Sequence, residues 1–100
     1  MTLVLDFSGS QTVREAEQVA ATLREALTAT SEIVIDCSRI EEVDLSFIQL
    51  VLAARKSADR DNKHLHLLTP AQGPLLKALD LAGVLPSGPH HFWFEGKNLA

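Results

Sequence analysis

Short apolar segments alternate along the chain with longer segments of helical periodicity. The apolar segments, residues 3–7, 33–35 and 64–68, have the length of β-strands. The second contains only β-branched residues, without polar alternation, which is typical of a strand buried on both faces of a parallel sheet. The third alternates histidine with leucine, so one side faces solvent. Ser8-Gly9-Ser10, directly after the first segment, predicts a turn.

The segments between and after these strands predict three helices. Residues 12–27 carry apolar side chains at intervals of three and four, and Thr12 and Glu15 have the spacing of a capping box at the helix start. The stripe expected to face the core is Val13, Ala16, Ala20, Leu23, Ala26 and Leu27. Residues 47–54 are apolar nearly all round, and the segment continues through Arg55-Lys56-Ser57-Ala58, which favours a largely buried helix. Residues 74–83 form a short third helix whose Gly83 is placed to take the left-handed conformation after its end.

Strands that alternate with helices at this spacing indicate crossover connections, and therefore an α/β fold with a mostly parallel sheet. We expect four to five strands and about three helices. With 100 residues, below the roughly 150 usual for one domain, the chain forms a single domain. We place this domain at residues 1–85, followed at 86–100 by a loop and a strand-like aromatic tail. That tail contains Phe92-Trp93-Phe94, which would cap the sheet edge, dock on a partner or fray.

Charge and cysteine content narrow the class of partner and the cellular compartment. The chain has 9 basic and 13 acidic side chains, a net charge of −4 that disfavours binding to nucleic acid. No segment approaches the roughly 18 consecutive apolar residues of a membrane span, and the N-terminus does not resemble a signal peptide. Cys37 is the single cysteine, so no internal disulfide forms, and we expect a cytoplasmic protein.

Two segments resemble the signature of the STAS domain family, which includes the bacterial anti-sigma-factor antagonists that regulate transcription. They are Ile33-Val34-Ile35-Asp36-Cys37-Ser38 and Val43-Asp44-Leu45-Ser46-Phe47-Ile48-Gln49-Leu50-Val51-Leu52. Family members carry a hydrophobic strand ending in Asp, a loop, and an Asp-x-Ser/Thr that opens a helix. The first helix, the strand at residues 64–68 and the ending Leu79-Asp80-Leu81-Ala82-Gly83-Val84 also sit where the family has them.

The resemblance implies a non-enzymatic interaction module that a partner kinase switches. In phosphorylatable members the switch is the Ser or Thr two residues after the Asp, and here that residue is Ser46. The modifying serine kinase is often also the anti-sigma factor. The partner-binding surface implied here is the loop at residues 38–44 with the start of the second helix. Its candidate residues are Asp36, Ser38, Glu42, Asp44, Leu45 and Phe47.

The residue pattern around Ser46 also has a purely structural interpretation. Ser46 and Gln49 have capping-box spacing, so the serine hydroxyl would satisfy an unpaired amide at the helix start. The two interpretations are compatible, because an N-cap hydroxyl lies at the surface end of its helix. A phosphate there would add about −1.5 to −2 charges near several acidic residues and weaken partner binding.

The residue after the switch departs from the family pattern. Members usually have a small residue there, commonly Gly, whereas this chain has Phe47, whose ring would crowd a kinase or mark a different partner. The first alternative is therefore an accessory subunit, similar to STAS proteins that stabilise ATPase components of lipid transporters, with Phe47 as a permanent anchor. The second alternative is a small hydrolase or phosphotransfer enzyme built on Asp36 and Asp44. A receiver-like site, however, needs an acidic pair after the first strand, where only Asp6 stands.

The remaining chemistry-bearing residues predict no cofactor and no metal. His64 and His66 share a strand face and His90 and His91 lie in the tail, but this is not the ligand set of a closed zinc site. Cys37 has neither a CxxC partner nor a catalytic histidine in its pattern. No glycine-rich phosphate loop is present, so ATP would come from a partner. The sequence leaves the oligomeric state open.

Overall fold

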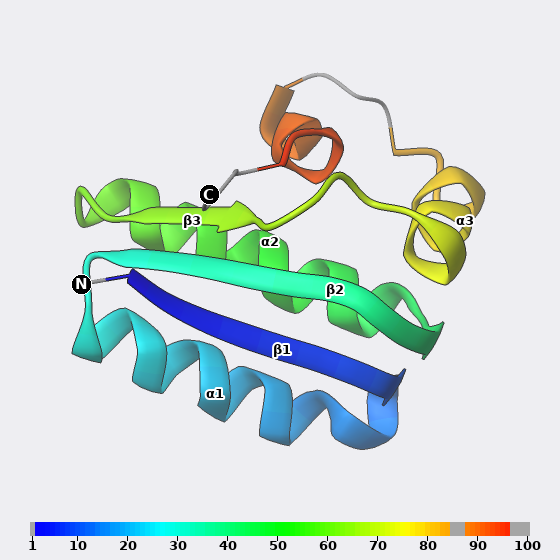
Figure 1. The fold of residues 1–100 in the computed structure, drawn as a ribbon, viewed down its shortest axis with the longest axis horizontal. Helices are drawn as coiled ribbons and strands as arrows, with labels where there is room; N and C mark the ends of the chain where they lie inside the picture. Colours follow the sequence, from blue (N-terminus) through cyan, green and yellow to red (C-terminus); the bar gives the residue numbers. More distant parts are fainter. Residues whose placement is uncertain (1, 85–87, 97–100) are drawn as a thin grey trace.

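The architecture consists of three parallel strands connected by helical crossovers. The computed structural model describes residues 2–84 and 88–96. The strands are β1 (Thr2–Gln11), β2 (Glu32–Val43) and β3 (His64–Leu67), in the sheet order β1-β2-β3. A 3₁₀ turn η1 (Val13–Glu15) and helix α1 (Ala16–Ala29) connect β1 to β2, and helix α2 (Leu45–Arg60) connects β2 to β3 (Figure 1). This confirms the predicted α/β fold with a parallel sheet.

The central strand is the one with the unbroken β-branched run. Ile33, Val34 and Ile35 are each 0% exposed, and β2 pairs in parallel with β1 on one side and β3 on the other. In register, Leu3, Ile33 and Leu65 lie side by side across the sheet. Ile33 and Ile35 point into the hydrophobic core, whereas Val34 points to the opposite face, where its neighbours in register are Val4, which is 45% exposed, and the half-buried His66. The helices therefore cover one face of β2, and on the other face Val34 is buried between neighbouring strands.

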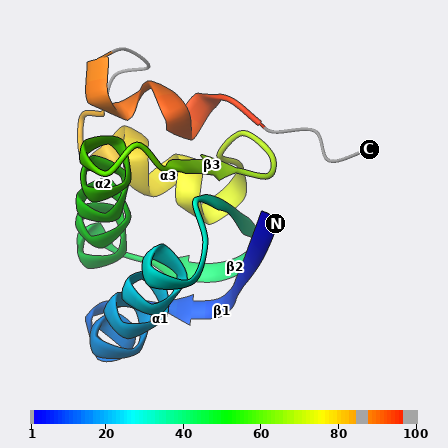
Figure 2. The same ribbon diagram turned by 90° about the vertical axis from the view of Figure 1, so that its left-hand side faces the viewer.

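Helices α1 and α2 pack side by side against the sheet, as Figures 1 and 2 show. The side chains that they bury are Val19, Leu23 and Ala26 from α1, and Phe47, Ile48, Val51, Ala54 and Ala58 from α2. Helix α3 (Gly73–Leu81) packs against β2 and buries Leu75 and Leu79. Its end confirms the role predicted for Gly83, whose φ is +74°. The amides of Gly83 and Val84 donate to the carbonyls of Asp80 and Leu79, the two bonds of a Schellman motif.

The sheet has three strands within the described residues, fewer than the four to five predicted. One reason is that β1 does not turn at Ser8-Gly9-Ser10 but continues to Gln11. The register shifts between Asp6 and Ser8 and again between Gly9 and Ser10, each time with an extra residue on β2. Gly9, with a φ of +67°, lies within these irregularities. The glycine that suggested a turn therefore accommodates a bulge inside a long strand.

The second reason is that the described aromatic segment, Gly88–Phe94, is helical. Residues Gly88–Phe94 form a 3₁₀ helix, η2, and not the predicted strand. Phe92 and Trp93 are 5% and 0% exposed, and their ring centroids are 4.6 Å apart. Trp93 also donates from Nε1 to His90 Nδ1 at 3.1 Å, and its carbonyl accepts from the Ala71 amide at 2.7 Å. In a strand, consecutive side chains point to opposite faces, whereas the helical turn directs both rings into the same core.

Trp93→Ala should lower the free energy of unfolding by about 3–5 kcal/mol, because it removes a fully buried aromatic side chain from the core. Urea denaturation followed by circular dichroism measures this loss. Leu81→Ala is the matched control, since Leu81 is 78% exposed, and should change stability by less than about 0.5 kcal/mol. Equal stability of Trp93→Ala and the unmodified chain would show that η2 is not part of the folded core.

Candidate partner-binding site

The candidate site lies at the end of the sheet where β1 and β2 finish and the following helical segments begin. Because the strands are parallel, η1 leaves β1 at the same edge at which α2 leaves β2 (Figure 1). The residues gathered here, Val13, Glu42, Asp44, Leu45 and Ser46, are called the Asp44 corner below.

Asp44 connects the two helical starts. Its backbone is extended, with φ −130° and ψ −175°, and it is the N-cap of α2. One carboxylate oxygen, Oδ1, accepts the Ser46 amide at 3.0 Å, and the other, Oδ2, accepts the Val13 amide at 3.0 Å. Each bond satisfies an amide that has no partner within its own helical turn. A single side chain therefore fixes η1 against α2.

A second set of polar side chains forms hydrogen bonds next to Asp44, where β1 and β2 end. The predicted capping box at Thr12 is confirmed, and the Thr12 amide donates to Glu15 Oε1 at 2.9 Å. The Ser10 hydroxyl lies 3.1 Å from Glu15 Oε1 and 3.0 Å from Glu42 Oε1, which joins the last residues of β1 and β2. Hydrogen bonds from the Thr12 backbone, with smaller contributions from the Thr12 and Ser10 hydroxyls, lower the pKa of Glu15. The corner therefore has a negatively charged rim.

Ser46 occupies the second position of α2 and not the cap. The capping role expected for it is wrong, because Asp44 lies two residues earlier in extended conformation and accepts the Ser46 amide itself. Ser46 is partly exposed, and no hydrogen bond holds its hydroxyl among the residues that the structure describes. The hydroxyl is therefore not needed to complete the helix start.

The apolar residues of the corner differ from those expected. Leu45 is 51% exposed and Val13 is 67% exposed, with Val13 joined to Asp44 through its amide. The sequence pattern assigned Val13 to the buried stripe, but η1 places it ahead of the first turn of α1, where its side chain faces solvent. Its position directly after the Thr12 cap was the available signal. The corner therefore presents two aliphatic side chains to solvent beside the acidic residues Glu42 and Asp44.

Phe47 is a core residue, which corrects its predicted place on the partner surface. It is 1% exposed, and its ring meets Phe7 edge to face, with centroids 5.3 Å apart. Phe47 lies on the face of α2 that also buries Val51, one helical turn later. The ring therefore neither obstructs an enzyme that approaches Ser46 nor anchors a partner at the surface.

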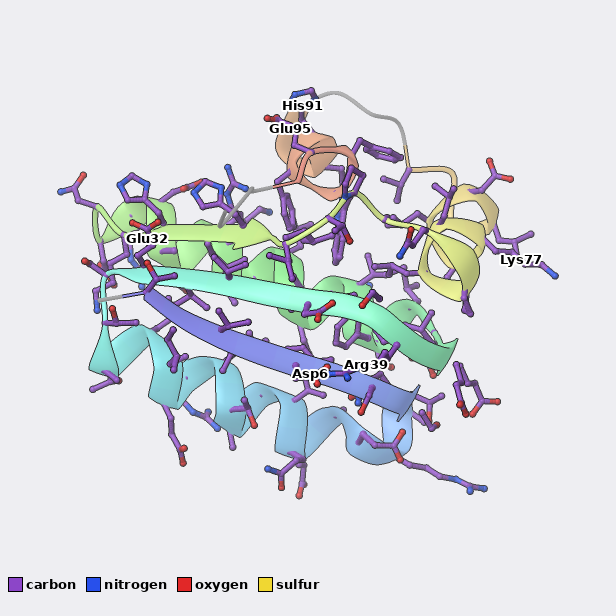
Figure 3. The ribbon with its side chains drawn as sticks, in the orientation of Figure 1. Asp6, Glu32, Arg39, Lys77, His91 and Glu95 are labelled. Atoms are coloured by element: carbon purple, nitrogen blue, oxygen red, sulfur yellow. The ribbon has the colours of Figure 1, made fainter. Side chains whose placement is uncertain are left out.

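Asp36 and Ser38 belong to a different part of β2. The Asp36 carboxylate accepts the Ser38 amide at 3.0 Å and the Ser38 hydroxyl at 2.7 Å. Arg39, the next residue, pairs with Asp6 on the adjacent strand (Figure 3). Residues 38–43 are strand and not the predicted loop, so about 20 Å of β2 separates Ser38 from Asp44. Of the predicted contact residues, Glu42, Asp44 and Leu45 belong to the Asp44 corner, whereas Asp36 and Ser38 lie farther back on β2 and Phe47 is buried.

The other candidate groups do not converge on a reactive centre within residues 2–84 and 88–96. No group of three or more His, Cys, Asp or Glu side chains there could hold a metal ion. The rings of His64 and His66 stack with centroids 6.1 Å apart. Burial, with a smaller effect of the Asp36 charge, raises the pKa of Cys37 to about 12. In the same part of the chain, every helix is too short or too polar to cross a membrane.

Comparison with known proteins gives one family and a recurring fold. A family model described as "Mlab, STAS domain" matches residues 1–85. A solved structure of the anti-sigma factor antagonist SpoIIAA in its unphosphorylated form is 22% identical, with a TM-score of 0.62 over 84% of this chain and 91% of that chain. A sulfate transporter family protein from Wolinella succinogenes is 17% identical, with a TM-score of 0.60 over 82% of this chain and 66% of that chain. At these identities the two structures show a shared fold. A comparison with curated proteins found no match.

Asp44→Ala should destabilise the protein by about 2 kcal/mol, because it removes the acceptors of two amides at once. Asp44→Asn keeps one acceptor oxygen, so it should cost roughly half as much. Thermal and urea denaturation of the two variants give the comparison. A loss in Asp44→Asn as large as in Asp44→Ala would contradict the view that the two oxygens act separately.

The Cys37 thiol should react slowly with iodoacetamide at pH 8. With its pKa raised to about 12, the reactive thiolate is scarce until the solution approaches that pH. Intact mass after timed alkylation of the native chain measures the rate, and the urea-unfolded chain serves as the control. Equal rates in the folded and unfolded chain would show that Cys37 is accessible.

Proposed function

The chain belongs to the STAS domain family, and from this premise we propose that it is a protein-interaction module that binds its partner through the Asp44 corner and is released by phosphorylation of Ser46. STAS domains of this kind are generally regulatory and non-enzymatic. The observation that carries the proposal is Ser46 itself, a partly exposed residue whose hydroxyl is not needed for capping because Asp44 is the cap. The proposed partner is a serine kinase that also acts as an anti-sigma factor, in the cytoplasm.

The corner has the composition of a small contact surface. Val13 and Leu45 provide exposed apolar area, and Glu42 and Asp44 provide negative charge beside it. Burial of aliphatic side chains supports affinity, and a charged rim supports selectivity for a partner with basic groups opposite. Asp36, Ser38 and Phe47 are left out of this surface, because the first two lie farther back along β2 and the third is buried.

A phosphate on Ser46 would alter this surface while leaving the fold in place. At the second position of α2 it lies near the positive end of the helix, which favours an anion by roughly 0.3–1 kcal/mol. It also adds about −1.5 to −2 charges next to the Asp44 carboxylate. To reverse occupancy from 99:1 to 1:99 takes about 5.5 kcal/mol of differential affinity. Charge alone is screened, so steric exclusion of the apolar contact must supply part of that difference.

A second candidate function is a permanently bound accessory subunit that stabilises an ATPase of a lipid-transport complex. The support for this candidate is the family model itself, which matches residues 1–85 and is described as "Mlab, STAS domain". Val13 and Leu45 would then be the constant anchors, in place of the buried Phe47. Ser46 would remain unmodified.

Incubation with ATP and host lysate should add one phosphate to the chain, detected by intact mass. Ser46→Ala should abolish the addition, whereas Ser38→Ala should retain it, because Ser38 is an exposed serine outside the corner. Ser46→Asp should bind the co-purified partner more than tenfold more weakly than Ser46→Ala, since it places a negative charge at the contact. Equal binding by these two variants would exclude the switch.

The same measurements separate the two candidates. No phosphorylation, together with an ATPase that co-purifies equally with all three serine variants, would support the accessory subunit. In both cases Leu45→Glu should weaken partner binding, because Leu45 is exposed in the corner and its replacement leaves the core intact. Leu76→Glu on α3, at a leucine 42% exposed, is the control.

A further inference from the structure

A polar cleft of about 360 Å³ lies between α2, β3 and η2, away from the Asp44 corner. Its apolar lining includes Leu52 and Leu67, and its polar lining includes Arg55, Lys56, His66 and His91. Lys56 is ten residues beyond Ser46 on α2, which corresponds to about 15 Å along the helix axis. Cavities of this size are in the range that holds small organic ligands.

Arg55 is fixed in position at the cleft. Its Nη1 donates to the Leu65 carbonyl at 3.1 Å, and its Nε lies 3.6 Å from Asp59 Oδ2. The guanidinium carbon is 4.8 Å from the centroid of the Phe92 ring, and 27% of the side chain is exposed. These contacts engage only part of the five N–H groups of the guanidinium. An arginine held in this way loses little rotamer freedom when a ligand binds.

The formal charges of the cleft balance, with Arg55 and Lys56 against Asp59 and Glu95, so its preference for an anion rests on which of these groups are already paired. Its two carboxylates are already paired, Asp59 with Arg55 and Glu95 with His91, whose Nε2 lies 2.5 Å from Glu95 Oε1 (Figure 3). Lys56 is exposed and has no acidic partner among the described residues. The cleft is therefore lined by one ammonium without an acidic partner and one oriented guanidinium, two groups that bind anionic oxygens.

The shape and lining of the cleft restrict the rest of the ligand. The volume exceeds what a single phosphate fills, so an organic body must accompany the anion. Phe92 is 5% exposed and lies under Arg55, so it offers no open ring on which a nucleobase could stack. The remaining acceptor positions of Asp59 and Glu95 suit hydroxyl donors. The body that fits is therefore small and rich in hydroxyl groups.

We propose that this cleft binds a small phosphorylated sugar or polyol, with its phosphate on Lys56 and Arg55 and its hydroxyls toward Asp59 and Glu95. The proposal does not rest on the function of the Asp44 corner, because it uses the other half of α2. It gives the domain a small-molecule ligand in addition to its protein partner.

Titration of the ¹⁵N-labelled full chain with glucose 6-phosphate and with glycerol 3-phosphate tests the proposal and distinguishes a sugar from a three-carbon polyol. At least one should give saturable shifts centred on residues 52–59, 66–67 and 88–96. Lys56→Glu should weaken that binding at least about tenfold, because it replaces a charged hydrogen bond by repulsion. Lys77→Glu makes the same charge change on exposed α3 and should bind as the unmodified chain does (Figure 3).

Three results would overturn the proposal. The first is that neither probe gives saturable shifts up to about 5 mM. The second is that Lys56→Glu and Lys77→Glu weaken binding equally. The third is that glucose or adenosine monophosphate binds as tightly as the phosphorylated probes do. Lys56→Gln, which removes the charge without reversing it, should show an intermediate loss and provides the measurement if Lys56→Glu does not fold.

Discussion

The parallel pairing of β1 and β2 is the constraint on which the rest of the structure depends. Parallel neighbours leave the sheet at the same edge, so the segments that follow them, η1 and α2, begin next to each other. Only in this arrangement can one carboxylate reach the first amides of both, as Asp44 does with bonds of 3.0 Å to Val13 and to Ser46. The candidate site is therefore a consequence of strand direction, and the buried β2 that enforces this direction also fixes the site.

Much of the fold follows from local signals in the sequence. Three local preferences agree with the tertiary structure. They are the β-branched run at β2, the capping box at Thr12 and the left-handed Gly83 after α3. The misplaced features have a common origin, since each depends on contacts between segments far apart in the sequence. Gly9 predicts a turn from its local sequence, but pairing with β2 makes it part of a bulge in which β2 supplies the extra residue. The aromatic segment predicts a strand from its local sequence, but the burial of Trp93 in the core accompanies a helical turn.

The site shows the same division between local and long-range information. The spacing of Asp44 and Ser46 marks the start of a helix, but two residues compete for its cap, and periodicity does not decide between them. The cap is Asp44, which also accepts a second hydrogen bond, from the Val13 amide 31 residues away in sequence. That choice leaves the Ser46 hydroxyl unengaged among the described residues. It also turns Phe47 toward Phe7, so the aromatic ring that set this chain apart from the family pattern has a structural role.

Helix α2 carries both candidate surfaces, the Asp44 corner at its start and the cleft along its second half. The two are coupled only if a ligand at one end makes different contacts in two states of the helix or its neighbours. Ala54, Ala58 and Val51 bury the middle of α2 against the core, which favours a single position for the helix. Polar links lie on either side of this packed stretch, where Asp44 holds η1 and Arg55 holds the edge of β3. A coupling between the two surfaces therefore requires a change in these polar links or in the packing of Val51, Ala54 and Ala58.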